Sequence, residues 1–178
     1  SGINFAMHFR LLQGKLPTFL ENREIRFYSL ITLGSIVLIS SSLWIFDGYT
    51  IGSALRYGAF QAVSVITTTG FSTDDYELWY SFGTFFLFML FFFGGCAGST
   101  AGGPKMIRWI IIIRNSFREI KQIVHPKAIL PIRIGDKTID LNIQRTVLSF
   151  FILYLIVFGL GALAISTMGY DLESSIGA

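Results

Sequence analysis

GSALRYGAFQAVSVITTTGF, residues Gly52–Phe71, holds the pattern from which the fold class can be inferred. Its first part, Gly52–Ile66, is moderately apolar but too short to cross a bilayer, which takes about 20 apolar residues in a helix. Its second part, Thr67–Phe71, contains a glycine and is followed by the acidic turn Ser72–Glu77. A half-length helix followed by an extended glycine-containing segment is typical of a re-entrant pore loop. Such backbone is tolerated at membrane depth only where protein or water covers it.

Three apolar stretches surround this segment. Phe27–Phe46 and Thr146–Ile165 are uncharged and long enough to span a membrane as helices. Tyr80–Phe93 is also uncharged, but it runs into a glycine cluster at Gly94–Gly103 and resumes as Met106–Ile113, which predicts a membrane helix broken in its middle. Only 14% of the residues are charged and 52% are hydrophobic, whereas soluble domains carry about 25% charged residues. The composition therefore favours a membrane protein.

The charges predict the topology. Thirteen of the fourteen Lys and Arg residues fall in Ser1–Arg26 and Lys105–Arg145. The opposite side of the predicted spans carries Arg56 and six acidic residues, namely Asp47, Asp74, Asp75, Glu77, Asp171 and Glu173. Since an excess of Lys and Arg marks the cytoplasmic side, the first helix runs outward, the loop enters from outside, the broken helix returns and the third helix runs outward. This topology accounts for the basic segments, so no nucleic-acid partner is predicted.

An internal repeat points to a larger architecture. GYTIGSAL at Gly48–Leu55 resembles GYDLESSI at Gly169–Ile176, with an offset of 121 residues that also superposes the first predicted helix on the third. A second copy of the Thr-Thr-Gly stretch is then expected near position 188, so we expect a fragment of a longer protein. The predicted organisation is a cytoplasmic lead-in (1–26), a helix–pore-loop–broken-helix unit (27–115), a basic cytoplasmic connection (116–145), and a helix with an incomplete pore helix (146–178).

An ion filter is predicted at Thr67, Thr68, Thr69, Gly70 and Phe71. A permeating cation that loses water needs oxygen ligands, and consecutive backbone carbonyls supply them where glycine permits the required dihedral angles. The preceding half-helix would direct its partly negative C-terminal end toward the cation. The alternative is an ordinary β-turn with Gly70 in a left-handed conformation. The position of the segment between two membrane helices favours the filter.

The glycine cluster is interpreted as a gating loop in the conduction path. Ser99, the adjacent pair Gly102 and Gly103, and Pro104 are poor helix formers, which favours an unwound segment. The alternative is helix packing, because glycines recur every four residues from Gly94. An ATP-binding loop is disfavoured, since the lysine comes one place late and no Ser or Thr follows it. The predicted gating residues are Gly94, Gly95, Cys96, Ala97, Gly98, Ser99, Thr100, Ala101, Gly102 and Gly103.

Residues around the two motifs carry weaker predictions. Lys105 and Arg108 are either positive-inside anchors or a barrier that moves with gating. The acidic turn Ser72–Glu77 either concentrates cations at the outer mouth or is simply solvated. The basic segment Arg114–Arg145 is a solvated linker, or it binds a regulatory subunit or anionic lipid headgroups. Cys96 is interpreted as a small buried residue, and the spans contain no charged residue or histidine, so no enzymatic activity and no catalytic residue is predicted.

These motifs resemble a known family. AVSVITTTGFSTDDYELW at Ala62–Trp79 and FFFGGCAGSTAGGPKMIR at Phe91–Arg108, with the opening SGINFAMHF, are similar to the Trk/Ktr/HKT superfamily of cation transporters, and most similar to the membrane subunits of bacterial Trk potassium-uptake systems. The resemblance implies an all-α integral membrane fold with four helix–pore-loop–helix units around one pseudo-fourfold, K⁺-channel-like pore. This chain would supply the third unit, Phe27–Asn115, and the first helix of the fourth. Pro104, where the family suggests an aliphatic residue, is a departure.

The resemblance also implies a function and partners. We expect K⁺ uptake by a channel-like transporter in the bacterial inner membrane, with K⁺ bound only at the filter and no other cofactor. The expected partners are the remaining pore units, a second copy in a homodimer, cytoplasmic nucleotide-binding regulatory subunits and membrane lipid. The alternative function is a glycine-rich membrane packing domain with no conduction role.

Overall fold

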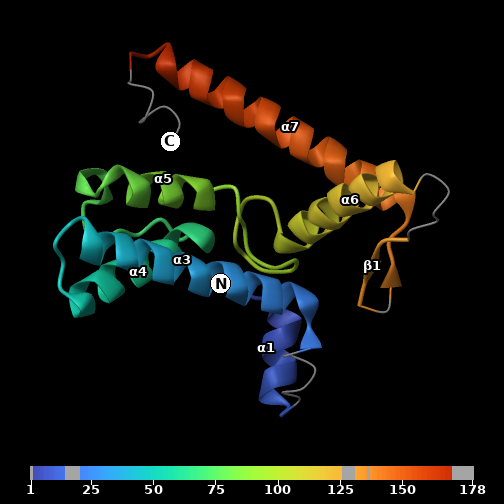
Figure 1. Cartoon of the computed structure of the whole chain (residues 1–178), viewed down its shortest axis with the longest axis horizontal. Helices are drawn as coiled ribbons and strands as arrows, with labels where there is room; N and C mark the ends of the chain where they lie inside the picture. Colours follow the sequence, from blue (N-terminus) through green and yellow to red (C-terminus); the bar gives the residue numbers. More distant parts are fainter. Residues whose placement is uncertain (1, 15–20, 126–130, 136, 170–178) are drawn as a thin grey trace. The chain divides into compact units, whose positions relative to one another are not determined.

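The computed structural model describes residues 2–14, 21–125, 131–135 and 137–169, and these are helical apart from one short hairpin and the connecting loops (Figure 1). The chain divides into two compact units, Ser1–Ile110 and Ile111–Ala178. The first unit contains α1 (Phe5–Leu12), α3 (Arg23–Ile45), α4 (Ile51–Ile66), the 3₁₀ turn η1 (Tyr76–Leu78), α5 (Ser81–Leu90) and the start of α6 (Met106–Val124). The second contains the rest of α6, β1 (Arg133–Ile134), β2 (Lys137–Thr138) and α7 (Leu141–Ser166).

Two helices have the length and composition needed to cross a membrane, α3 with 23 residues and α7 with 26. At 1.5 Å per residue each is longer than a hydrocarbon core of about 30 Å. α3 begins four residues before the predicted Phe27, because the Asn22 side chain caps it by accepting the N–H groups of Glu24 and Ile25. α7 begins five residues before the predicted Thr146. Both predicted spans are therefore helical, with longer N-terminal ends.

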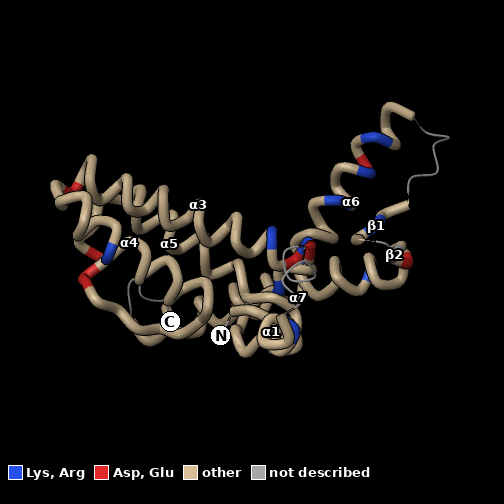
Figure 2. The backbone as a smooth tube through the Cα atoms, turned by 90° about the horizontal axis from the view of Figure 1, so that it is seen from below, with Lys and Arg blue, Asp and Glu red and all other residues tan. Residues whose placement is uncertain are grey.

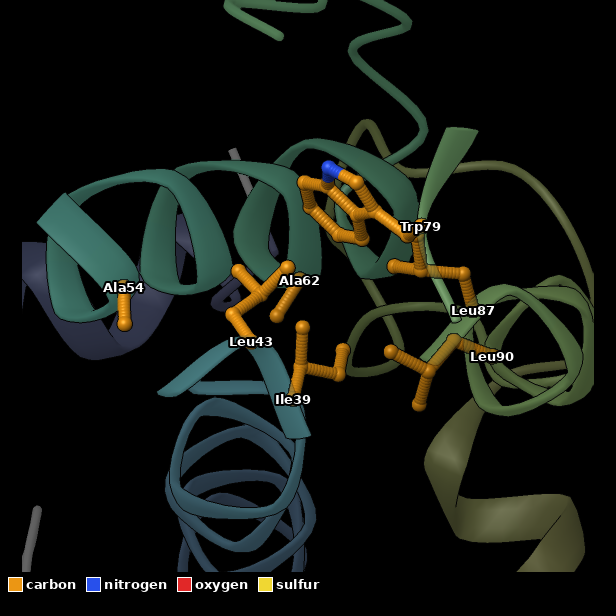
Figure 3. Packing of buried hydrophobic residues seen from close by; sticks show 7 residues of the cluster. All are labelled: Ile39, Leu43, Ala54, Ala62, Trp79, Leu87 and Leu90. Carbon is orange, nitrogen blue, oxygen red and sulfur yellow. The ribbon is translucent and has the colours of Figure 1, made fainter. Parts of the chain in front are cut away.

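The core of the first unit lies where α3, α4 and α5 pack side by side (Figure 1). α4 follows the predicted half-length helix to within one residue. Its small residues, Ala54 and Ala62, allow it to lie against the side chains of Ile39 and Leu43 on α3. Figure 3 shows the whole cluster, which consists of Ile39, Leu43, Ala54, Ala62, Trp79, Leu87 and Leu90. This packing fixes the end of α4 and hence the start of the predicted filter.

The predicted break between the second helix and its continuation is present. α5 ends at Leu90, three residues before the predicted Phe93, and α6 begins at the predicted Met106. Residues 94–103 belong to no helix. The helix-packing alternative needed a continuous helix through these glycines, so it is wrong for this segment. Glycine and proline are poor helix formers, and several of them lie close together here. Their combined effect outweighs the four-residue spacing of the glycines, which had suggested a packed helix.

The region predicted as a basic connection, 116–145, is more structured than a linker. α6 continues past the predicted boundary at 115 and α7 begins before the boundary at 146, so both boundaries fall inside helices. Apolar residues recur along α6 at Ile113, Phe117, Ile120 and Val124, which extends the helical period beyond the last uninterrupted apolar run. The basic residues of this region lie between them. Figure 2 shows blue segments along α6, whereas α3 carries charge only in its first turn.

The second unit is held by a buried glutamine. The Gln144 side chain accepts from Arg118 Nη1 at 2.7 Å and donates to the carbonyl of Ile139 at 2.9 Å, which joins α6, the hairpin exit and the first turn of α7. β1 and β2 pair antiparallel, with Arg133 opposite Thr138. Most of the α7 surface is exposed within this unit, and its apolar side chains include several leucines and isoleucines.

The predicted repeat has a counterpart at the ends of the two long helices. α3 ends three residues before Gly48, and α7 ends three residues before Gly169. Both glycines have a left-handed backbone, with φ of +71° and +90°. The rest of the second copy, Tyr170–Ile176, lies outside the described residues.

Candidate functional site

The predicted filter begins where α4 ends, and the helix ends in a Schellman motif. The Thr68 N–H donates to the Val65 carbonyl and the Thr69 N–H donates to the Ser64 carbonyl, both at 2.9 Å. This 6→1 and 5→2 pairing places one residue in the left-handed conformation, and that residue is usually glycine. Here it is Thr68, with φ of +52°. A β-branched residue in this region is a genuine outlier, and such strain persists only where the surroundings impose it.

The Thr68 side chain shows what its surroundings are. Its Oγ1 accepts the backbone N–H of Gly102 at 2.7 Å. The two residues are 34 positions apart, and Gly102 belongs to the predicted gating loop. The filter turn and the glycine loop, which were predicted as separate motifs, therefore meet through one hydrogen bond.

The rest of the filter segment is held by hydroxyl groups. Ser64 Oγ donates to the Phe71 carbonyl at 2.6 Å, which ties the end of the segment back to α4. Thr67 Oγ1 donates to the Val63 carbonyl at 2.7 Å, so the hydroxyl of Thr69, 2.6 Å away, is the donor in their mutual bond. Gly70 has φ of +78°, a backbone that other residues rarely adopt. The segment is thus an irregular loop whose two ends are hydrogen-bonded to the helix that precedes it.

The backbone carbonyl oxygens of this loop are the predicted ligands of a cation. Among the described residues, no hydrogen bond uses the carbonyl oxygen of Thr67, Thr68, Thr69 or Gly70 as its acceptor. Thr67 is buried, whereas the next residues up to Phe71 are exposed within the first unit. Unpaired carbonyls suit both an ion filter and a solvated turn, so this stretch remains a predicted filter.

The glycine loop is closed at its neck. The Gly94 N–H donates to the Pro104 carbonyl at 2.9 Å, and the Met106 N–H donates to the Gly95 carbonyl at 3.1 Å. A compact loop with adjoining ends is an Ω-loop. The neck is so tight that a Cβ on Gly94 would lie 2.3 Å from the Gly102 carbonyl oxygen. Pro104 fits here because it is fully buried and serves the neck through its carbonyl rather than through an N–H.

Lys105 folds back onto the loop. Its Nζ donates to the Ser99 carbonyl at 3.2 Å and also to the carbonyl of Ala101, with a longer contact of 3.5 Å to Ser99 Oγ. The ammonium group thus binds oxygen atoms of residues 99–101, which we call the crest of the loop. Both interpretations of Lys105, a positive-inside anchor and a barrier that moves with gating, stay predictions. Arg108 lies in the first turn of α6, with its N–H donating to the Lys105 carbonyl at 2.9 Å.

Two residues that bind the loop, Glu24 and Asn4, were not predicted from the sequence. Glu24 Oε1 accepts the N–H of Ala97 at 2.6 Å and the N–H of Ile107 at 3.1 Å. Asn4 Nδ2 donates to the Ala97 carbonyl at 2.6 Å. These partners are 73 to 93 residues apart in sequence, which no local pattern reveals. The only available signal was a lone carboxylate in the first turn of a helix that is otherwise uncharged beyond Arg26.

The acidic turn before α5 is partly structural. Asp74 Oδ2 accepts from the Tyr49 hydroxyl at 2.8 Å and from Trp79 Nε1 at 3.0 Å. Burial opposes ionisation of Asp74, but hydrogen bonds from Tyr49, Trp79 and the Asp75 N–H outweigh it and lower the pKa of this carboxyl. Asp75 caps η1 through its side chain. Glu77 is exposed, and its carboxylate accepts no hydrogen bond from the residues that the structure describes.

No group of three or more His, Cys, Asp and Glu side chains gathers anywhere in the described ranges. Cys96 is fully buried with a free thiol, as predicted, and it packs with Ile66 and Met106.

The long apolar helices, with a half-length helix and an interrupted one between them, are consistent with an α-helical integral membrane protein. The chain matches the TrkH family, described as cation transport protein, over residues 1–176, and it belongs to that family. It is 36% identical over 172 residues to the Trk system potassium uptake protein TrkH of Halomonas elongata. It is 35% identical over 176 residues to the Trk system potassium uptake protein TrkG of Escherichia coli.

The fold agrees with this assignment. The crystal structure of the potassium transporter TrkH from Vibrio parahaemolyticus matches with a TM-score of 0.89 at 31% identity, over 97% of this chain and 38% of that chain. The match with the Halomonas protein covers 96% of this chain, and the chain spans only 36% of that relative's length. The resemblance to the Trk family inferred from the sequence is thereby confirmed.

Proposed function

We propose that this chain is one helix–pore-loop–helix unit, with the first helix of the next unit, of a potassium-uptake transporter. The relatives are named potassium uptake proteins, and the family is described as cation transport. In this proposal Thr67–Phe71 supplies one quarter of a filter that binds K⁺ through carbonyl oxygens. Gly94–Gly103 is the gating loop, and K⁺ moves inward through a pore completed by the other units.

The observation that carries the proposal is the hydrogen bond from Gly102 to the Thr68 hydroxyl. A gate must lie in the path of the ion, close to the filter. The strained turn at Thr68 lies within Thr67–Gly70, whose carbonyl oxygens accept no hydrogen bond among the described residues, and the loop contacts that turn. A packing domain with no conduction role does not require the strained turn at Thr68 or its contact with the loop.

The remaining features are consistent with a subunit of an assembly in the bacterial inner membrane. The exposed apolar surfaces of α7 and α3 suit lipid and neighbouring pore units. The basic face of α6 suits cytoplasmic regulatory subunits or anionic headgroups. A homodimer and nucleotide-binding regulators are proposed on the family resemblance. No chemical step or bound cofactor is involved.

The test is rubidium uptake by the full-length parent protein in a host without its own potassium uptake. Gly70→Asp places a charge in the filter, and Gly70→Ala strains its left-handed backbone. The matched control is Gly48→Ala, because Gly48 also has a left-handed φ, and an added Cβ at either glycine meets nothing within 4 Å. The two alanine variants thus carry similar strain at different places.

Loss of uptake, or a changed preference between Rb⁺ and Na⁺, in both Gly70 variants but not in Gly48→Ala would support the filter. Membrane abundance is measured alongside to exclude a folding defect. Equal uptake in all the variants would contradict the filter assignment. It would leave the alternative function, a glycine-rich membrane packing domain with no conduction role.

A further inference from the structure

We propose that Glu24 is a positioning residue that holds the glycine loop against the filter turn. The proposal rests on the proposed function insofar as the loop is a gate. Glu24 lies in the first turn of α3, outside both predicted motifs. A single carboxylate oxygen, Oε1, accepts N–H groups from Ala97 in the loop and from Ile107 in the first turn of α6. It thereby joins three segments of the first unit.

The chemistry of this contact suits a clamp. The amides of a helix start carry partial positive charge and have no partner inside the helix, so a carboxylate there is stabilising. Hydrogen bonds to ionised groups are about twice as strong as neutral ones. Asn22 caps α3 and accepts the Glu24 N–H at 3.0 Å, which fixes the backbone that carries the carboxylate. The backbone of Glu24 is therefore fixed by Asn22, and its carboxylate bonds both to the loop and to α6.

Glu24 and Lys105 hold complementary groups of the same loop. Glu24 accepts a hydrogen bond from the Ala97 N–H, whereas the Lys105 ammonium donates to the carbonyls of Ser99 and Ala101. No ion pair between Glu24 and Lys105 is found in the described part of the chain, so each charge is directed to the loop backbone. One anion and one cation together fix the backbone on both sides of the crest.

The N-terminal residues of the chain hydrogen-bond to the same part of the loop, at Cys96 and Ala97. The Cys96 N–H donates to the Gly2 carbonyl at 2.8 Å, and Asn4 Nδ2 donates to the Ala97 carbonyl at 2.6 Å. Ala97 is thus held through its N–H by Glu24 and through its carbonyl by Asn4. Because the side of the loop at Cys96 and Ala97 is fixed in this way, Gly102 on the other side stays hydrogen-bonded to Thr68. Glu24 accordingly stabilises the position in which the loop lies at the inner end of the filter.

Cys96 provides a local reporter of this position, because it is the only cysteine in the chain and is fully buried beside Ala97. The experiment uses the full-length parent with any cysteine outside this chain replaced. Labelling by N-ethylmaleimide is timed in Glu24→Ala, Glu24→Gln and the wild type. Glu21→Ala is the matched control, since Glu21 is exposed and carries the same charge three residues earlier. Glu24→Ala should label about tenfold faster, the factor expected from losing a hydrogen bond to a charged group.

A second reporter separates local release from general destabilisation. Leu43→Cys with Cys96→Ser places the thiol in the separate core cluster of α3, α4 and α5, where Leu43 is fully buried. Glu24→Ala should leave the labelling of that thiol unchanged. Glu24→Gln keeps an acceptor oxygen but not the charge, and should restore part of the Cys96 protection. Unchanged Cys96 labelling in both Glu24 variants, or equal acceleration of both reporters, would overturn the proposal.

Rubidium uptake in the same variants distinguishes the clamp from the gate. If the loop is a gate, Glu24→Ala should raise the maximal uptake rate severalfold, because the loop is held less firmly in the conduction path. Faster Cys96 labelling with unchanged uptake would leave Glu24 as a clamp and overturn the gating role of the loop instead.

Discussion

At the scale of single residues, the site depends on a threonine where a glycine is expected. A non-glycine residue in the left-handed region costs roughly 1–2 kcal/mol, and the bond from Gly102 to the Thr68 hydroxyl returns about 1 kcal/mol. The two terms nearly cancel. The threonine therefore adds little stability, and its measurable contribution is the link between filter turn and loop.

Thr68→Gly is accordingly expected to change the free energy of unfolding by less than about 1 kcal/mol. It should nevertheless speed labelling of Cys96, because the loop loses its bond to the turn. Thr68→Ser keeps the hydroxyl and should behave like the wild type in both assays. The measurements are thermal unfolding in detergent and maleimide labelling. A large loss of stability in Thr68→Gly would show that the link matters chiefly for folding.

The neck of the loop supports a second prediction. A Cβ on Gly94 would meet the backbone oxygens of Gly102 and Pro104 at 2.3 and 3.0 Å, whereas one on Gly102 would meet only Thr68 side-chain atoms at 3.5 Å. Gly94→Ala should therefore destabilise the protein by about 1–3 kcal/mol or more, and Gly102→Ala should be tolerated. The comparison of thermal unfolding and membrane abundance checks this. Equal behaviour of the two variants would contradict the closed neck.

At the scale of elements, the outer turn is held by a carboxylate shared between two segments. Asp74 joins Tyr49, after α3, to Trp79, before α5. Its pKa in the folded state is lowered, so the ionised carboxylate stabilises the turn above the ordinary Asp value of about 3.9. That stabilisation is lost as the pH falls through the folded-state pKa.

The thermal stability of the wild type should thus fall below about pH 4 more steeply than that of Asp74→Asn. At pH 7 the variant should already be the less stable protein. Glu77→Gln removes the same charge from the exposed part of the turn and should follow the wild type. The check is thermal unfolding across the acidic range. Parallel curves for the wild type and Asp74→Asn would sink the assigned role of Asp74.

Much of the element pattern could be predicted from the sequence, for physical reasons. Uncharged runs such as Phe27–Phe46 can only be membrane or core helices, and the concentration of glycine before Pro104 can only interrupt one. Helix ends were less predictable, because the side chain of Asn22 and the period of α6 extend helices past their apolar runs. The Glu24 and Asn4 contacts were not predictable, since they join residues distant in sequence. Of the candidate site, the two motifs were found but their hydrogen bond was not.

At the scale of the whole molecule, the charge distribution predicts a topology that can be tested directly. Glu77 lies on η1, and Lys121 lies near the end of α6, and both are exposed. In the full-length parent without other reactive cysteines, Glu77→Cys should react with an impermeant maleimide on intact cells. Lys121→Cys should react only in inverted vesicles. The reverse pattern would contradict the orientation inferred from Lys and Arg.

The closed neck of the loop has a mechanical consequence. Two backbone hydrogen bonds join Gly94 and Gly95, which follow α5, to Pro104 and Met106 at the start of α6. We therefore expect a sideways force on α6 to turn the helix about that neck. α6 has 19 residues and is therefore about 28 Å long. A sideways shift of about 5 Å at its far end is then a rotation of only about 10° at the neck. A displacement at the far end of α6 therefore reaches the residues that hold the loop as a small rotation.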